Sequence, residues 1–213
     1  MLVIFDTEGV LIDGEFLPEL AKIIEKEDEI LEITNKGING EINWEQGLME
    51  RINQLKGITY NECIQVANNL PIMQGARETF DELRRLGFTT LTVSGGPDIL
   101  VNRVKNELNI DYAVSNTLIF VDEKLDGVDL KVGSNKVSAI ESILKEINET
   151  KENTVTTVDG ANDLALLEIS GLKISFNGTK IINEKSDAIV SEKDLRSIIP
   201  IIKYGIKSSK SLG

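Results

Sequence analysis

The first residues of the chain form a continuous apolar run, LVIF at residues 2–5, which is typical of a strand buried on both faces. From about residue 15 to residue 70, apolar residues recur instead at helical spacing. This spacing predicts short helices over residues 17–26, 28–35, 44–56 and 59–69, with Gly37 and Gly40 breaking the pattern and Pro71 closing it. A helical segment is therefore expected directly after the first strand.

Beyond Pro71 the pattern changes to alternating strands and helices. The sequence predicts strands at 88–93, 112–114, 117–121, 154–158, 172–176 and 188–190, and the turn-rich residues 121–127 indicate a hairpin. It predicts helices over 76–86, from Pro97 to Leu108, and over 136–148, 162–169 and 194–203. Alternation of this kind is typical of a parallel sheet with helices on both faces.

Together these elements predict an α/β protein made of two parts. A doubly wound, Rossmannoid core with a parallel sheet is expected from residues 1–13 and 74–213. A small helical cap domain, residues 14–73, is expected as an insertion after the first strand. The 213 residues are enough for one substantial core and a small accessory domain.

Charge and composition narrow the classes of partner. The 23 basic and 35 acidic residues give a net charge of −12, which disfavours nucleic acid, although the local charge of a cleft can still attract a small anion. No stretch approaches the roughly 20 apolar residues of a membrane helix, so no membrane partner is expected. Cys63 is the only cysteine, which excludes an intrachain disulfide and favours the cytoplasm. A monomer or a homodimer is expected.

The absence of histidine restricts the chemistry further. It excludes Ser-His-Asp and Cys-His mechanisms, as well as zinc sites built on imidazole. A metal ion would have to be held mainly by oxygen, which favours a hard cation such as Mg²⁺. Catalysis must then come from carboxylates, lysine, hydroxyls and backbone amides.

Polar residues of these types follow the predicted strands. In an open α/β sheet, ligands bind beyond the carboxyl ends of the strands. The residues expected at that edge are Asp6-Thr7-Glu8-Gly9, Ser94-Gly95-Gly96-Pro97, Lys136 at the head of a helix, and Asp159-Gly160-Ala161-Asn162-Asp163. Each motif alone has an ordinary interpretation as a turn, a helix cap or a solvated face. Their joint placement at strand ends favours a site.

The residue types at that edge suit phosphoryl transfer. Asp6 can attack phosphorus and form an aspartyl phosphate, and Asp6 and Asp159 supply hard oxygen ligands for a metal ion. Ser94 is expected to precede a helix that starts at Pro97, whose amino end would form a phosphate cradle. Lys136 can neutralise charge on both the nucleophile and the phosphate.

These motifs resemble those of the haloacid dehalogenase superfamily and, within it, the phosphoserine phosphatases. DTEGVL (6–11), VSGG (93–96), Lys136 and VDGANDLALL (158–167) are similar to the four motifs of the superfamily in their order along the chain. In the predicted cap, GEINWEQGLMERINQLKGI (40–58) is similar to the corresponding segment of the phosphoserine phosphatases. The resemblance covers nearly the whole chain.

The resemblance implies a role for each matching residue. It assigns Asp6 as nucleophile and metal ligand, and Glu8 as general acid and base with a backbone carbonyl on the metal. It assigns Asp159 as a second metal ligand and Asp163 as a ligand that acts through water. It places Ser94, Gly95 and Lys136 in contact with the phosphate, and Asn162 in contact with the phosphate or the substrate. In the cap, it places Glu15 on the amine of the substrate and Arg51 on its carboxylate. An Arg that clamps a carboxylate and a Glu that pairs with an ammonium would together recognise an amino acid.

The sequence also departs from the pattern of that family. The acid/base position holds Glu8 instead of aspartate, and the extra methylene predicts slowed rather than abolished hydrolysis. Gly9 stands where the family commonly has serine, and Val158 stands where it has the first glycine of its fourth motif. Ile38 and Trp44 stand where the family usually has a methionine and a phenylalanine against the substrate. Trp44 could also be part of the core packing.

The sequence therefore predicts a Mg²⁺-dependent phosphomonoester hydrolase for a small phosphorylated metabolite. Phosphoserine is the first candidate. Two alternatives remain: a phosphatase or phosphotransferase for another phosphate ester, and a catalytically impaired member with a binding or regulatory role, which the glutamate at position 8 motivates.

Overall fold

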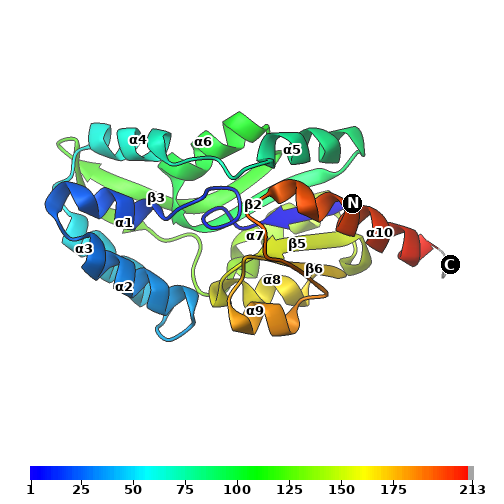
Figure 1. Ribbon diagram of the computed structural model, residues 1–213. Coiled ribbons are helices and arrows are strands. Elements are labelled where there is room, and N and C mark those ends of the chain that lie inside the picture. The colour runs from blue at the N-terminus through cyan, green and yellow to red at the C-terminus, as the bar shows by residue number, and fades with distance from the viewer. Residues whose placement is uncertain (211–213) are drawn as a thin grey trace.

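The computed structural model describes residues 1–210, so the last three residues of the predicted core lie outside it. Within that range the strands form one seven-stranded sheet in the order β4-β3-β2-β1-β5-β6-β7, parallel except for the β3–β4 pair (Figure 1). The strands are β1 (Leu2–Phe5), β2 (Thr89–Pro97), β3 (Tyr112–Val121), β4 (Lys124–Asp129), β5 (Thr154–Val158), β6 (Leu172–Phe176) and β7 (Ala188–Val190). The predicted doubly wound α/β fold is confirmed.

Helices cover both faces of this sheet. The α-helices that follow β1 in the core are α5 (Ala76–Arg85), α6 (Asp98–Leu108), α7 (Lys136–Ile147), α8 (Leu164–Glu168), α9 (Lys180–Lys185) and α10 (Ile198–Lys210). Side chains alternate along β1: Val3 and Phe5 pack in one cluster with α5, α6 and α10, and Leu2 and Ile4 pack in another with α7, α8 and α9. Within residues 1–210, none of the helices combines the length and the apolarity needed to span a membrane.

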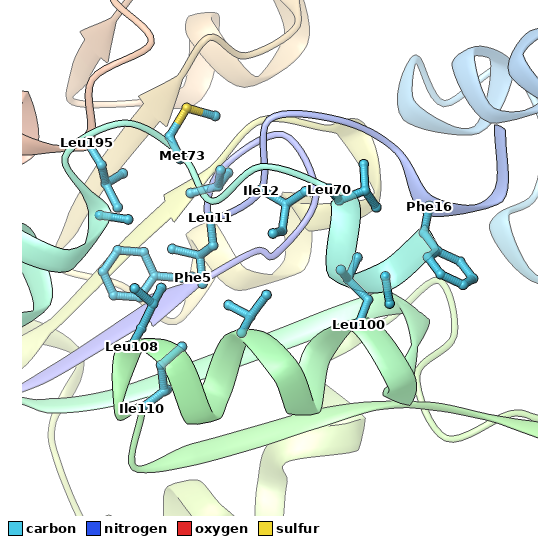
Figure 2. Packing of buried hydrophobic residues seen from close by; sticks show 14 of the residues in the cluster. Phe5, Leu11, Ile12, Phe16, Leu70, Met73, Leu100, Leu108, Ile110 and Leu195 are labelled. Atoms are coloured by element: carbon cyan, nitrogen blue, oxygen red, sulfur yellow. The ribbon is translucent and has the colours of Figure 1, made fainter. Parts of the chain in front are cut away.

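Four further helices lie between β1 and β2 in the chain. They are α1 (Phe16–Ala21), with the short 3-10 helix η1 (Lys22–Ile24), α2 (Glu27–Ile38), α3 (Trp44–Leu55) and α4 (Tyr60–Asn69). Figure 1 shows α1, α2 and α3 gathered beside one end of the sheet. Their apolar side chains join the larger core cluster, and Figure 2 shows Phe16 and Leu70 approaching Leu100 of α6. This continuous packing holds α1–α4 against the core.

Two local predictions about glycine and proline are wrong. Gly37 lies inside α2 instead of breaking it, because its lack of a side chain makes room for the Trp44 ring: a Cβ there would be 3.0 Å from Cε3. The helix ends at Ile38, and Gly40 follows with a φ of +75°. Pro97 is the last residue of β2 and caps α6, which begins at Asp98, so Pro97 does not occupy the first helical position.

Other element boundaries also differ from those predicted. Residues 112–114 and 117–121 belong to a single strand, β3, and α9 was not predicted. The helix predicted over 162–169 consists of a 3-10 turn, η3 (Ala161–Asp163), followed by α8, and the one over 194–203 begins with η4 (Leu195–Ser197). Two-turn and 3-10 elements give too little periodicity to be recognised in a sequence.

The buried cysteine provides a test of the packing of α4. Cys63 is fully buried, and burial raises the pKa of its thiol to about 12. A raised pKa leaves less thiolate at a given pH, so alkylation by iodoacetamide at pH 8 should be about 10³-fold slower than for a free thiol. Mass spectrometry should show rapid labelling in urea and almost none in buffer. Equally rapid labelling under both conditions would contradict the packing of α4.

Candidate active site

The site lies where three neighbouring parallel strands end. Asp6 directly follows β1, Ser94 lies within β2, and Asp159 directly follows β5. Phe5 pairs with Thr92 on one side and Thr157 on the other, so Asp6, Ser94 and Asp159 all follow within two residues of the same level of the sheet, although β2 itself continues to Pro97. This level register delivers residues separated by up to 153 positions to one edge of the sheet.

A buried lysine lies among the carboxylates at this edge. Lys136, the first residue of α7, places Nζ 2.8 Å from Oδ1 of Asp6 and 2.6 Å from Oδ1 of Asp163. Burial works against the charged ammonium, but the charges of Asp163 and Asp6 outweigh it and raise the pKa of Lys136. The lysine is thus held as a cation next to Asp6.

The carboxylates form a group that fits a hard divalent cation. Oxygens of Asp6, Asp159 and Asp163 lie within 4.8 Å of one another. Burial, followed by the charges of Asp6 and Asp163, raises the pKa of Asp159 well above its usual value, and burial raises that of Asp163 to about 7. Because one lysine opposes three carboxylates, the group carries excess negative charge that a cation would neutralise.

Gly9 is required beside this group for a steric reason. It has a φ of +74°, and a Cβ at this position would lie 2.1 Å from Oδ2 of Asp159. Both facts favour glycine, which has no side chain to clash and tolerates this backbone conformation. The residue that replaces a common serine therefore leaves space for the Asp159 carboxylate.

Glu8 is fixed by a backbone contact and directed toward β2. Its Oε1 accepts a hydrogen bond of 2.7 Å from the backbone N–H of Phe16, at the start of α1. Its Oε2 lies only 2.1 Å from the position that a Cβ on Gly96 would take. Burial raises the pKa of Glu8 to about 7, with a smaller increase from the charge of Asp6. A carboxyl with this pKa can donate or accept a proton near neutral pH.

Hydrogen bonds within β2 and from Asn116 of β3 hold the end of β2 in place. Ser94 is buried, and its Oγ accepts a bond of 3.0 Å from the backbone N–H of Gly96. Asn116 donates from Nδ2 to the backbone oxygen of Gly95 at 2.9 Å, while its Oδ1 accepts from Val132 N at 2.8 Å. These bonds give the Ser-Gly-Gly segment one defined path through the site.

A small pocket joins most of the residues that the sequence singled out. It is lined by Asp6, Glu8, Glu15, Ile38, Trp44, Ser94, Gly95, Gly96, Asp159 and Asn162. Lys136 and Asp163 lie behind Asp6, connected to it through the lysine ammonium. The free volume is about 10 Å³, which is room for little more than one water molecule. The helices between β1 and β2 thus close over the strand ends.

Arg51 has a different position from the other predicted site residues. It is buried within the helices between β1 and β2 and is not among the described residues that line the pocket. It donates from Nε to Gly47 O at 3.1 Å and from Nη1 to Thr34 Oγ1 at 2.8 Å, with its guanidinium carbon 4.9 Å from the centre of the Trp44 ring. Burial lowers its pKa, and the charges of Glu8 and Glu15 oppose that change. Arg51 therefore lies behind Trp44.

Glu15 does line the pocket, together with Asp6 and Asp159. Burial raises its pKa well above the usual value, and the charges of Glu8, Asp159 and Asp6 raise it further. An ammonium group placed here would relieve this repulsion between carboxylates.

The sequence interpretation missed some supporting residues. Thr34 anchors the Arg51 guanidinium, and the backbone N–H of Phe16 orients Glu8. Thr34 is a polar residue among the isoleucines of α2, and that exception to the pattern could have drawn attention to it. No sequence signal marks the Phe16 N–H, because every residue except proline carries one.

Comparisons with known proteins identify the family and the fold. A family model described as haloacid dehalogenase-like hydrolase matches residues 1–171. The phosphoserine phosphatase of Methanocaldococcus jannaschii is 36% identical to this chain, and the match covers 95% of this chain and 97% of that protein. The phosphoserine phosphatase of Archaeoglobus fulgidus is 31% identical, and the match covers 99% of this chain and 62% of that protein. A solved structure of a substrate-bound phosphoserine phosphatase has a TM-score of 0.90 at 35% identity, covering 94% of this chain and 97% of that one. A phospho-aspartyl intermediate analogue of a phosphoserine phosphatase also scores 0.90, at 36% identity and the same coverage.

Proposed function

The chain belongs to the haloacid dehalogenase-like hydrolases, and from that premise we propose that it is a Mg²⁺-dependent phosphatase that hydrolyses phosphoserine through an aspartyl phosphate on Asp6. One observation carries the proposal. Asp6 lies next to a buried lysine and within a group of three carboxylates, and it lines the same pocket as Glu8, whose pKa is about 7. A nucleophile, a cation and an acid/base group thus meet at one place.

The reaction proceeds in two displacements at phosphorus. In the first, a carboxylate oxygen of Asp6 attacks phosphorus, the bond from phosphorus to the ester oxygen breaks, and Glu8 gives its proton to the leaving alkoxide. In the second, Glu8 takes a proton from water as the water oxygen attacks phosphorus, which releases inorganic phosphate and regenerates Asp6. Lys136 neutralises negative charge on Asp6 and on the phosphoryl group in both steps.

The metal site of the proposal consists of oxygen ligands. Asp6, Asp159 and the backbone carbonyl of Glu8 would hold Mg²⁺, with Asp163 acting through water. The ion would supply positive charge for the phosphoryl oxygens. Ser94, Gly95 and Asn162 complete the set of groups that we assign to the phosphate.

Substrate recognition in this proposal depends on the inserted helices. We propose residues 14–73 as a cap whose Glu15 receives the substrate ammonium and whose Arg51 pairs with the substrate carboxylate. Both side chains interact electrostatically with Glu8, which supports their closeness to the reacting centre. The pocket has room for about one water molecule, so we propose that part of the cap moves aside for the substrate to enter. Glu45 of α3, which accepts from Ser134 N at 2.9 Å, would separate in that motion.

The proposal extends to location and partners. A phosphorylated metabolite is the partner that the site favours, and the net charge of −12 disfavours nucleic acids. We place the enzyme in the cytoplasm, since Cys63 is a free, buried thiol.

Phosphate release from a panel of esters tests the proposal. With Mg²⁺, phosphoserine should have a higher kcat/KM than phosphoethanolamine, which lacks the carboxylate, and than p-nitrophenyl phosphate, which lacks both charged groups. Chelation by EDTA should abolish the activity. Turnover of another ester alone would favour a different substrate, and binding of phosphate without any turnover would favour an impaired, regulatory protein.

The acid/base role of Glu8 gives a separate prediction. Glu8→Gln keeps the size of the side chain but removes the transferable proton, so kcat should fall by about 10²- to 10⁴-fold. Glu8→Asp keeps a carboxyl and should retain more activity than Glu8→Gln, although the shorter side chain loses its position against Phe16. Steady-state kinetics of both variants with phosphoserine provide the measurement. Equal rates for the two variants would show that the carboxyl group of residue 8 does not transfer the proton.

A further inference from the structure

The indole N–H of Trp44 is a buried hydrogen-bond donor in the wall of the pocket. Trp44 is 8% exposed, and its Nε1 has no acceptor within residues 1–210. Buried polar atoms without a partner are uncommon in folded proteins, and each calls for an explanation. The steps assigned above to Asp6 and Glu8 make no use of this donor.

This nitrogen lies against the segment that we propose to hold the phosphate. A Cβ on Gly95 would be 2.3 Å from Nε1 of Trp44, and both residues line the same pocket. The backbone oxygen of Gly95 already accepts a hydrogen bond from Asn116. The donor edge of the ring is therefore next to Gly95 and close to Ser94, where it lacks a protein partner.

The ring is held in this orientation by its other neighbours. On the α2 side, Gly37 leaves room for it, since a Cβ there would be 3.0 Å from Cε3. On another side the guanidinium carbon of Arg51 lies 4.9 Å from the ring centre. Such packing fixes the direction of the N–H before a ligand arrives, which reduces the entropy lost on binding.

We propose that the indole N–H of Trp44 donates a hydrogen bond to a phosphoryl oxygen of the bound substrate. This inference rests on the proposed function, to which it adds one specific contact. A neutral donor suits this pocket, because a cationic side chain would pair with Glu8 or Glu15 instead of waiting for an anion. Loss of one hydrogen bond to a charged oxygen should weaken binding about 10- to 100-fold.

The indole group can be observed directly, since Trp44 is the only tryptophan. The full-length protein labelled with ¹⁵N therefore gives a single indole N–H signal. In the presence of Mg²⁺, inorganic phosphate is expected to move this signal downfield, whereas serine alone should leave it in place. A signal that remains fixed while phosphate saturates the protein, or that responds to serine instead, overturns the proposal; so does a protein that binds no phosphate.

Kinetics of Trp44→Phe provide the second readout, because phenylalanine keeps an aromatic ring and removes the donor. The expected result is a 10- to 100-fold lower kcat/KM for phosphoserine and p-nitrophenyl phosphate alike, since both carry the phosphoryl group. Tyr60→Phe is the matched control: Tyr60 is 45% exposed on α4, packs edge-on against Phe120, and its loss of a hydroxyl should leave activity unchanged. The stability of Trp44→Phe should change by two opposing effects, because an unpaired donor is removed while packing against Gly37 and Arg51 is lost.

The outcomes separate this contact from the proposed function. A loss confined to phosphoserine would place the N–H on the amino-acid part of the substrate and would contradict the phosphoryl contact. If the wild-type protein releases no phosphate from phosphoserine, the proposed function fails, while the response of the indole signal to inorganic phosphate still decides the role of Trp44.

Discussion

Replacing Asp6 with asparagine is expected to lower phosphate release by at least about 10⁴-fold while leaving the protein folded. The amide that replaces the carboxylate is a poor nucleophile, so no aspartyl phosphate can form. Asp6 contacts Lys136 at 2.8 Å, yet Lys136 keeps Asp163 at 2.6 Å in the variant. Removal of one negative charge also relieves the repulsion that raises the pKa of Asp159 and Asp163. The free energy of unfolding in EDTA should therefore not decrease.

Rapid acid quenching during turnover tests the same prediction at the intermediate. The wild-type protein should gain the mass of one phosphoryl group, and Asp6→Asn should not. Asp13→Asn is the matched control, because Asp13 is an exposed aspartate seven residues further on that pairs with Lys193 at the surface. It should behave as the wild type in both assays. Turnover by Asp6→Asn within tenfold of the wild-type rate would show that Asp6 is not the nucleophile.

Most of the fold follows from periodicity in the sequence. The LVIF run predicts β1 with its observed bounds, and the alternation after residue 74 predicts the parallel sheet. The errors occur where tertiary contacts override local preferences. Gly37 remains helical because the Trp44 ring fills the space beside it, and Ser94–Pro97 remain extended because Asn116 holds the backbone of Gly95. Such contacts join residues distant in sequence, and local patterns do not record them.

The sequence predicts which residues form the candidate site better than it predicts how their side chains are arranged. Asp6, Ser94 and Asp159 each follow a predicted strand, and parallel strands direct their carboxyl ends to one edge of the sheet, so these residues are expected to lie close together. The orientation of Glu8 depends on the Phe16 N–H, and its pKa of about 7 depends on burial, so neither could be predicted. The sequence also gave no reason to expect Arg51 behind the Trp44 ring, outside the pocket lining. These features come from packing between the inserted helices and the sheet.

Replacing Lys136 with methionine is expected to destabilise the metal-free protein by about 3–5 kcal/mol. The side chain of Lys136 is fully buried, and its ammonium is paired with Asp6 and Asp163. Methionine fills a similar volume but leaves the carboxylates buried without their cation. The same change removes a positive charge from the reacting phosphate, so kcat should fall by about 10²- to 10³-fold even at saturating Mg²⁺.

The loss of stability in Lys136→Met should increase with pH. Burial and the charge of Asp6 raise the pKa of Asp163 from its ordinary value of 3.8 to about 7, and Lys136 opposes this rise. A carboxyl whose pKa is higher when folded binds more protons in the folded state, so stability falls as the pH rises between its unfolded and folded pKa values. Without Lys136 the folded pKa rises further. Stability should then continue to fall above about pH 7, where the contribution of Asp163 in the wild-type protein has become constant.

Urea unfolding in EDTA at several pH values measures both effects. Lys145→Met is the matched control, because Lys145 lies on the same helix with its side chain 80% exposed and its nearest carboxylate, Glu141, 3.7 Å away. An exposed pair of this kind contributes little, so this variant should stay close to the wild type at every pH. If Lys136→Met were as stable as Lys145→Met across the whole range, Lys136 would not be the cation that compensates Asp6 and Asp163, and the charge arrangement proposed for catalysis would have to be abandoned.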